Sequence, residues 1–218
     1  IAQELASDHS LGDTVWSAAE QLDLKNWNDR EILTFDPTVV NGAGGKPFRV
    51  ANLNSEQQLA LEDDPGSSIV DFSAEFTTQI TKHVNYLRGD AANERPLGNL
   101  RERPAVKGRL GDIVSSTPVY YGAPTRTRRN SPPYPTAEPY IAFQAAHASR
   151  TPAIYVASND GMAHGFDAVT GEELFAFVPN HIITGEYSQR IKQLLSTNYA
   201  HRFSVDLSIA VNDVYLDA

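Results

Sequence analysis

The sequence predicts a mainly β chain with helical insertions, and one stretch of it has the pattern of a β-propeller blade. Residues 152–179 contain three short runs rich in the β-branched and aromatic residues that favour strands. Two turns separate the runs, one at Asp160-Gly161 and one at residues 167–171. Both contain a glycine, which suits the positive φ that tight hairpins need. Because a closed propeller needs at least four blades, we expect this chain to hold only part of one.

The third run of this stretch, residues 173–178, is apolar on both faces. Alternation predicts Leu174, Ala176 and Val178 on one face and two phenylalanines on the other. Such a strand is typical of a blade packed between neighbouring blades. Only one full blade is evident, so we expect its apolar faces to be covered by the remainder of the parent polypeptide.

The region before the blade predicts helices with one strand pair. Residues 10–22 have apolar residues at helical spacing after Asp13, which favours a helix. Residues 31–35 and 48–50 are strand candidates. The Gly-rich loop between them, residues 41–47, lacks the first Gly and the final hydroxyl of a phosphate-binding loop, so we interpret it as a hairpin loop.

Two helices follow the strand pair. Asn54 or Ser55 begins a short one at residues 56–61. Residues 73–87 carry one apolar stripe, which predicts a longer helix that ends at Gly89.

The remaining segments divide the chain in two. We expect an extended linker at 91–109, a Pro-rich insertion at 131–149, a helix at 187–196, and one or two strands at 205–216. The prediction is an N-terminal α+β part at residues 1–104 that leads into a propeller blade region at residues 105–218.

Composition excludes several classes of function. The 218 residues include no Cys, which removes disulfides, thiolate catalysis and Cys-based zinc sites. A net charge of −9 argues against nucleic-acid binding, and we interpret the basic loop with Arg126, Arg128 and Arg129 as a solvated one. No apolar run is long enough to span a membrane. The chain begins at Ile1 with no initiator Met or signal peptide, from which we expect a piece of a longer polypeptide.

The sequence contains no catalytic or metal-binding motif that we recognise, so we predict a non-enzymatic protein. No Ser lies in G-x-S-x-G, and no His pair has metal-ligand spacing on a predicted helix. We interpret His164 and His201 as structural histidines whose ring nitrogens are satisfied.

The tripeptide Arg88-Gly89-Asp90 has two interpretations. In the first it is an integrin-type binding motif, with Arg88 and Asp90 on an exposed turn. In the second it ends the helix, with Arg88 at the negative end of the helix dipole and Gly89 in the left-handed C-cap position. The two are compatible if the helix end is exposed.

The blade motif YVASNDGMAHGFDAVTGEELFAFVP resembles the signature blade of the PilY1/PilC family of type IV pilus proteins. The segments LGDIVSSTPVYYG at 110–122, YSQRIKQLLSTNYAHRFSVD at 187–206 and VNYLRGD at 84–90 are also similar to that family. The chain departs from the family pattern at Leu207 and Ile209, where Gly and Pro are usual. The resemblance covers roughly residues 69–211 and implies a fragment of a C-terminal, quinoprotein-like modified propeller.

The resemblance also implies a function. Family members act in type IV pilus biogenesis, twitching motility and cell adhesion, at the pilus tip or outer surface of a Gram-negative bacterium, reached through the periplasm. Implied partners are pilins or minor pilins and a host receptor. The family binds calcium on a D-x-D/N-x-D-G loop, which this sequence lacks, so the resemblance implies calcium only for the parent protein. Two alternatives stay open: a quinoprotein-like oxidoreductase, whose blades carry a related motif, and a periplasmic scaffold propeller.

Overall fold

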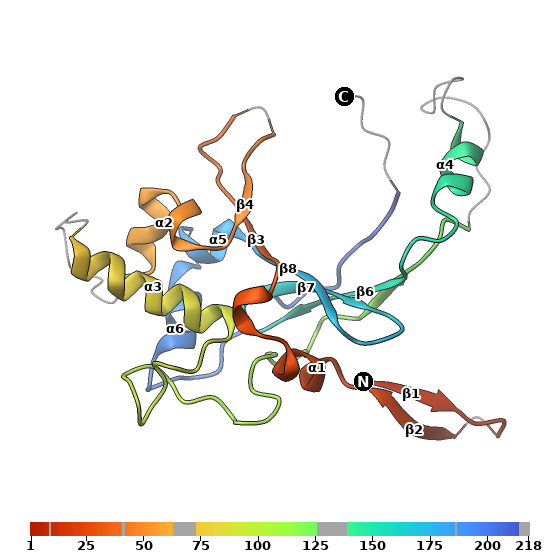
Figure 1. Cartoon of the computed structure of the whole chain (residues 1–218), viewed down its shortest axis with the longest axis horizontal. Helices are drawn as coiled ribbons and strands as arrows, with labels where there is room; N and C mark the ends of the chain where they lie inside the picture. The colour runs from red at the N-terminus through yellow and green to blue at the C-terminus, as the bar shows by residue number, and fades with distance from the viewer. Residues whose placement is uncertain (9, 41, 63–72, 126–138, 186, 214–218) are drawn as a thin grey trace.

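A six-stranded sheet with helices over one face forms the centre of the molecule (Figure 1). The computed structural model describes residues 1–8, 10–40, 42–62, 73–125, 139–185 and 187–213. The strand order is β4-β3-β8-β7-β6-β5, and the sheet is open at both edges. The predicted basic loop at 126–129 lies outside the described residues, as do the first residues of the insertion predicted at 131–149 and residues 214–216.

Four consecutive antiparallel strands form the predicted blade. They are β5 (Val119–Tyr121), β6 (Ala153–Ser158), β7 (Met162–Asp167) and β8 (Glu173–Val178). The turn glycines have the expected positive φ, 90° at Gly161 and 75° at Gly171. The carboxylate of Asp167 accepts the backbone amides of Val169 at 2.7 Å and Thr170 at 3.0 Å. The three strands and two turns predicted from the sequence are therefore confirmed, and the segment at 110–122 supplies the fourth strand.

The N-terminal part extends this sheet beyond the blade. β3 (Ile32–Phe35) runs parallel to β8, with Ile32 beside Ala176, and pairs on its other side with β4 (Gly45–Pro47). A hairpin is present as predicted, but the prediction of a strand at 48–50 is wrong. The second strand, β4, lies inside the predicted loop at 41–47, and residues Val50–Asn52 form the short helix η2. The division at 104/105 stays a prediction, and the sheet crosses it because β3 pairs with β8.

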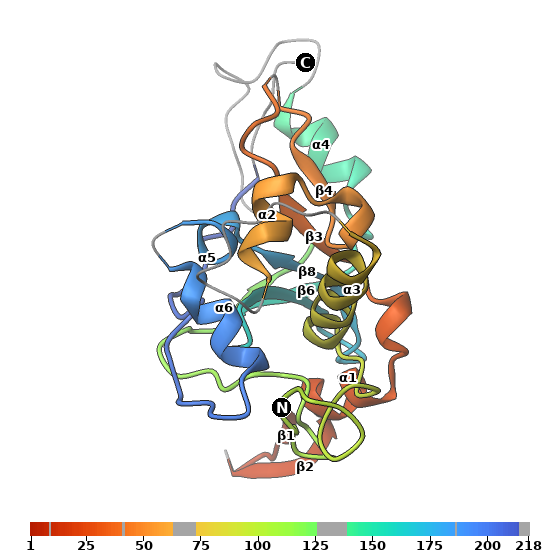
Figure 2. The same cartoon turned by 90° about the vertical axis from the view of Figure 1, so that its left-hand side faces the viewer.

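Four helices cover one face of the sheet: α2 (Ser55–Ala60), α3 (Ala74–Arg88), α5 (Asn180–Ile183) and α6 (Ser188–Leu195) (Figure 2). Asn54 caps α2 in a capping box with Gln57, and Ser73 caps α3. The apolar stripe of α3 packs in one buried cluster with Met162, Ala176 and Val178 of the blade. The helices predicted at 56–61, 73–87 and 187–196 are thus confirmed.

The prediction of a helix over residues 10–22 is wrong in its first half. β1 (Ala2–Leu5) and β2 (Leu11–Trp16) form a hairpin that projects from the body, and α1 (Ala18–Leu24) begins only after it, followed by the short helix η1 (Trp27–Asp29) (Figure 1). The helical spacing over residues 15–22 arises because the last residue of the strand, Trp16, and two residues of the helix, Ala18 and Leu22, all face inward.

Leu174 does not share the buried face of Ala176 and Val178 as alternation predicted; it is 40% exposed. A register shift between β7 and β8 is the reason, because Phe166 pairs with Glu173 while Gly165 pairs with Phe175. The extra residue is a β-bulge, which changes the alternation of faces. Glu173 consequently lies on the buried face.

The strands predicted at 205–216 are absent from the described portion, which ends at residue 213. Two side chains of this segment instead bind backbone amides of the segment 110–122: Ser115 N–H donates to the Asp206 carboxylate at 2.9 Å and Thr117 N–H to the Ser208 hydroxyl at 3.0 Å. The predicted insertion at 131–149 contains α4 (Tyr140–Ala146). Residues 91–109 form no helix or strand, as expected of a linker, but Leu100 is buried in the core.

Candidate functional site

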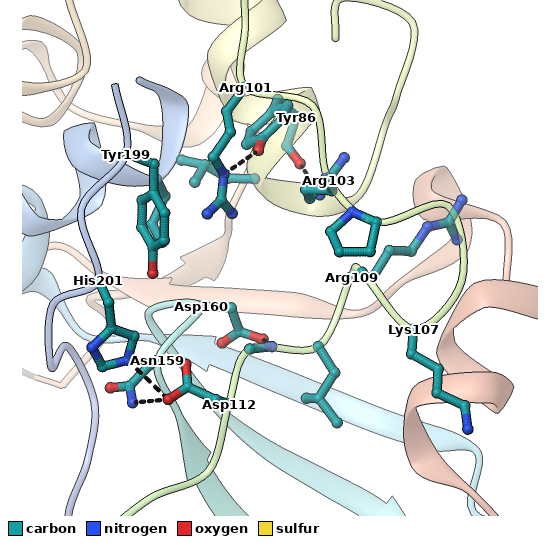
Figure 3. A pocket seen from close by; sticks show the side chains of 16 residues that line it. Tyr86, Arg101, Arg103, Lys107, Arg109, Asp112, Asn159, Asp160, Tyr199 and His201 are labelled. Carbon is teal, nitrogen blue, oxygen red and sulfur yellow. Dashed lines mark hydrogen bonds and ion pairs between the residues drawn. The ribbon is translucent and has the colours of Figure 1, made fainter. Parts of the chain in front are cut away.

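A pocket of about 250 Å³ lies beside the tip of the β6–β7 hairpin (Figure 3). Its walls come from the end of α3, the segment 101–112 and the chain after α6. The residues that line it are Tyr86, Leu87, Arg101, Arg103, Pro104, Lys107, Gly108, Arg109, Leu110, Gly111, Asp112, Asn159, Asp160, Leu194, Tyr199 and His201. None of these residues was predicted as a site residue.

Asp160 forms the floor of the pocket and is fixed by the hairpin turn. Its carboxylate accepts backbone amides from Met162 at 3.1 Å and from Gly111 at 3.0 Å. The second bond ties the segment 101–112 to the hairpin. His164 Nε2 lies 3.1 Å from Oδ2 of the same carboxylate.

A chain of buried charges runs from this floor into the sheet. His164 Nδ1 lies 2.9 Å from Glu173 Oε1, and Arg30 donates to both Glu173 oxygens at 2.7 Å and 2.8 Å. Burial alone would lower the pKa of His164, but the two carboxylates beside it raise that pKa to about 9. Burial would likewise raise the pKa of Glu173, but Arg30 and His164 lower it to about 2. The structure confirms that both ring nitrogens of His164 are satisfied.

Three of the four cations around the pocket are already engaged. Arg103 binds Glu94 at 2.6 Å, and Lys107 binds Glu20 at 2.8 Å. Arg109 donates to the carbonyls of Leu22 and Lys25, and burial lowers its pKa.

Arg101 is held differently from these three. Its Nε donates to the Tyr86 hydroxyl at 3.2 Å, and its guanidinium lies 4.0 Å from the centre of the Tyr199 ring. Figure 3 shows the guanidinium beside this ring, pointing into the pocket above Asp160. Within the part of the chain that the structure describes, its two terminal amino groups have no hydrogen-bond or ion-pair partner.

A polar cluster closes the far side of the pocket. His201 Nε2 lies 2.8 Å from Asp112 Oδ2, and the Asn159 side chain donates to the same oxygen at 3.2 Å. Asn159 also accepts the backbone amide of Ser204 at 2.9 Å. The structural interpretation of His201 is consistent with this contact, although its ring is 45% exposed.

The predicted tripeptide lies at the end of α3, at one side of this region. Arg88 is only 1% exposed, and its guanidinium donates to backbone carbonyls, at 2.8 Å to Arg30 and 3.2 Å to Phe48. Gly89 has φ 116° and is the left-handed C-cap, so the helix-ending interpretation is confirmed. An integrin-type contact needs an exposed Arg88, and this buried guanidinium does not meet that requirement.

The pocket has the size and the polar groups of a small binding site. The described residues include no cluster of three or more His, Asp or Glu that could hold a metal ion. No helix among them is long and apolar enough to cross a membrane. What the pocket offers is one oriented guanidinium with aromatic and apolar walls. Sequence patterns could not reveal it, because Arg101 and Tyr199 belong to irregular segments far apart in the chain.

Comparisons with known proteins point to one family. The family model described as "PilY1 beta-propeller domain" matches residues 110–218. A type IV pilus biogenesis factor PilY1 homolog of Xylella fastidiosa is 36% identical over 192 residues, which cover 85% of this chain and 15% of the relative.

Two Pseudomonas aeruginosa relatives agree with this result. The type IV pilus biogenesis factor PilY1 of strain PAK is 34% identical over 88% of this chain and 16% of its own length. The protein of the same name from strain UCBPP-PA14 is 30% identical over 98% of this chain and 17% of its own length. The chain thus spans only about a sixth of these curated relatives. No solved structure shows significant similarity to it.

Proposed function

This chain belongs to the PilY1 family, and we propose that it is a non-enzymatic part of a type IV pilus biogenesis factor. The observation that supports the proposal most strongly is the identity of 36% to a relative named as such a factor, over 85% of the chain. We place the whole protein at the pilus tip or outer surface of a Gram-negative bacterium, in contact with pilins or minor pilins and with a host surface. Calcium binding, if the parent has it, would lie outside these residues.

The shape of the sheet supports a role as one component of a larger propeller. One face is covered by helices. The opposite face carries Tyr155, Phe175 and Phe177, which are only half-buried, and the first two contact each other with ring centres 6.1 Å apart. Propeller blades pack against neighbours, so we propose that the remainder of the parent polypeptide covers this face.

The two alternative functions have less support. A quinone cofactor would need a channel between several blades, and the pocket of about 250 Å³ is smaller than the ~300–1,000 Å³ usual for cofactor-sized ligands. No feature of the described residues favours a periplasmic scaffold over a pilus component.

A complementation experiment tests the proposal. The parent gene is deleted from its bacterium and restored as wild type, as Phe177→Asp or as the control Leu174→Asp. Leu174 lies on the same strand but at the exposed bulge. We expect the deletion to abolish surface pili and twitching, Phe177→Asp to restore them poorly, and Leu174→Asp to restore them fully.

Two results would contradict separate parts of this proposal. Normal pili in the deleted strain would overturn the pilus role. Pili lost on deletion but fully restored by Phe177→Asp would leave the pilus role and overturn the packing of the sheet face. Circular dichroism of the 218-residue chain with each substitution shows whether its fold is retained.

A further inference from the structure

We propose that the pocket binds a small organic carboxylate through the guanidinium of Arg101. This inference concerns a site that the pilus role does not require, so it stands or falls independently of that role. Its basis is the contrast between Arg101 and the other cations around the same pocket.

Three contacts fix the position of Arg101, one through its backbone and two through its guanidinium. The backbone amide of Arg101 donates to the Leu195 carbonyl at 3.0 Å, which fixes the residue against α6. Its Nε binds the Tyr86 hydroxyl at 3.2 Å, and its plane is held near the Tyr199 ring. Tyr86 is itself buried, at 2% exposure. The two terminal amino groups are therefore presented to the pocket in a fixed position, so that little side-chain freedom is lost on binding.

Among the described cations that line the pocket, Arg101 is the one whose terminal amino groups both lack a partner. Arg103 and Lys107 are paired with Glu94 and Glu20, and Arg109 is bound to backbone carbonyls. A guanidinium whose two terminal amino groups are free can donate one N–H from each to the two oxygens of a carboxylate, as a bidentate pair. The Tyr199 hydroxyl has no hydrogen-bond partner among the described residues and is a second donor group in the same pocket.

The floor of the pocket selects against more highly charged anions. Asp160 lies beneath Arg101 (Figure 3), and Asp112 lies near it. Asp160 is already paired with the charged His164. The carboxylate of Asp112 would repel a phosphate dianion more strongly than a monoanion, since like charges at close range are unfavourable in a partly buried site. A ligand with a hydroxyl or amide donor next to its carboxylate could also bind the free Asp112 oxygen.

The size of the pocket limits the ligand to a small molecule or a single side chain. Its volume of about 250 Å³ is enough for an amino-acid side chain or a small acid, and the apolar wall of Leu87 and Leu194 suits a short aliphatic stem. The same carboxylate could come from a Glu or Asp side chain of a protein segment or from a free small molecule. The experiment distinguishes these two sources.

NMR titration of the 218-residue chain tests the proposal directly. The ¹⁵N-labelled protein is titrated at constant ionic strength with sodium acetate, with N-acetylglutamate amide and with sodium phosphate. We expect saturable shifts of the Arg101 Nε–H signal and of the amides around Tyr199 with both carboxylates, and weaker effects of phosphate. Tighter binding of N-acetylglutamate amide than of acetate indicates a side-chain ligand, and equal or weaker binding indicates a free acid.

Variants separate specific binding from general attraction to positive charge. Arg101→Gln should weaken carboxylate binding at least about tenfold, and Arg101→Lys should weaken it less, because a lysine keeps the charge but loses the bidentate fork. Arg95→Gln removes the same charge from an exposed position of the same segment and should leave binding unchanged. If Arg101→Gln disturbs the spectrum as a whole, Arg101→Lys and Tyr199→Phe decide in its place.

Three results would overturn the proposal. They are the absence of saturable shifts with either carboxylate, equal binding by the Arg101 variants and the wild type, and phosphate binding as tight as carboxylate binding.

Discussion

Arg30 and Glu173 form a two-pronged ion pair in the interior, with N–O distances of 2.7 Å and 2.8 Å and side chains that are 1% and 0% exposed. Arg30 precedes β3 and Glu173 begins β8, so the pair joins the N-terminal part of the chain to the blade. Arg30 also donates to the carbonyl of Arg88 at 2.6 Å. The end of α3 is thereby tied to the same point.

Removing one partner of this pair should be costly. Glu173→Gln leaves the charges of Arg30 and His164 buried with a neutral neighbour, and breaking a buried pair in this way typically costs about 3–5 kcal/mol. We expect urea denaturation to show a loss of that size. Glu172→Gln is the matched control, because Glu172 is exposed and its side chain makes no hydrogen bond or ion pair with the described residues; it should change stability by less than about 0.5 kcal/mol. Similar values for the two variants would contradict the role assigned to Glu173.

The charge of His164 predicts a pH dependence. Its pKa is about 9 in the folded chain against an ordinary value of 6.5. A group whose pKa is raised by folding stabilises the native state fully below the unfolded pKa and loses that contribution as pH rises through the folded pKa. Stability should therefore fall between pH 6.5 and 9.

A His164 variant isolates this effect from other titrating groups. The free energy of unfolding is measured by urea denaturation at several pH values for the wild type and for His164→Gln. The variant is expected to be less stable throughout but to have a shallower slope over pH 6.5–9. Equal slopes would show that His164 is neutral in the folded chain.

Local sequence signals predicted the parts of the fold that local chemistry determines. The turn glycines, Gly161 and Gly171, have the positive φ that their positions in the hairpins indicated. The apolar stripe of α3 and its C-cap at Gly89 were also predicted from the sequence. The parallel pairing of β3 with β8 could not be predicted, because Ile32 and Ala176 are far apart in sequence and nothing local specifies their contact. The N-terminal hairpin was not predicted because the apolar residues at helical spacing continue from the end of β2 into α1. The spacing alone does not show where the strand ends and the helix begins.

The candidate site was less predictable than the fold. A binding role could be suggested for the tripeptide at residues 88–90 because the sequence alone does not show which side chains are buried. In the structure Arg88 is only 1% exposed. Arg101 was passed over as part of a polar linker. Its importance depends on which neighbouring cations are already paired, and only the assembled structure shows this.

Gly89 should tolerate no side chain without loss of stability. Its φ of 116° is unfavourable for other residues, and an added Cβ would lie 3.3 Å from the Arg109 side chain. We expect Gly89→Ala to cost roughly 1 kcal/mol or more in thermal or urea denaturation. Gly45→Ala is the control, because its φ is not positive and no atom lies within 4 Å of the added Cβ. Equal stability of the two variants would contradict the capping role.

Asp90→Glu separates helix ending from receptor binding. Among the described residues, the side chain of Asp90 accepts only the local amide of Ala92, at 3.0 Å, so stability should change little. Because Arg88 is buried, we also expect attachment of the bacterium to host cells to be unchanged when the parent protein carries this substitution. Lost attachment with unchanged stability would instead establish an integrin-type role for Asp90.

Gly171 provides the last prediction, because it combines a positive φ with a close neighbour. An added Cβ would lie 2.5 Å from the ring of Trp16, which is 8% exposed and donates to the Ala168 carbonyl at 3.3 Å. Gly171→Ala should therefore lower the free energy of unfolding by roughly 1 kcal/mol through backbone strain and by about 1–3 kcal/mol more through overpacking. Gly42→Ala is the matched control: φ is 78°, but nothing lies within 4 Å, so only the strain remains. The Trp16 fluorescence should also shift in Gly171→Ala alone, and equal losses without that shift would contradict the close packing of the Trp16 ring against Gly171.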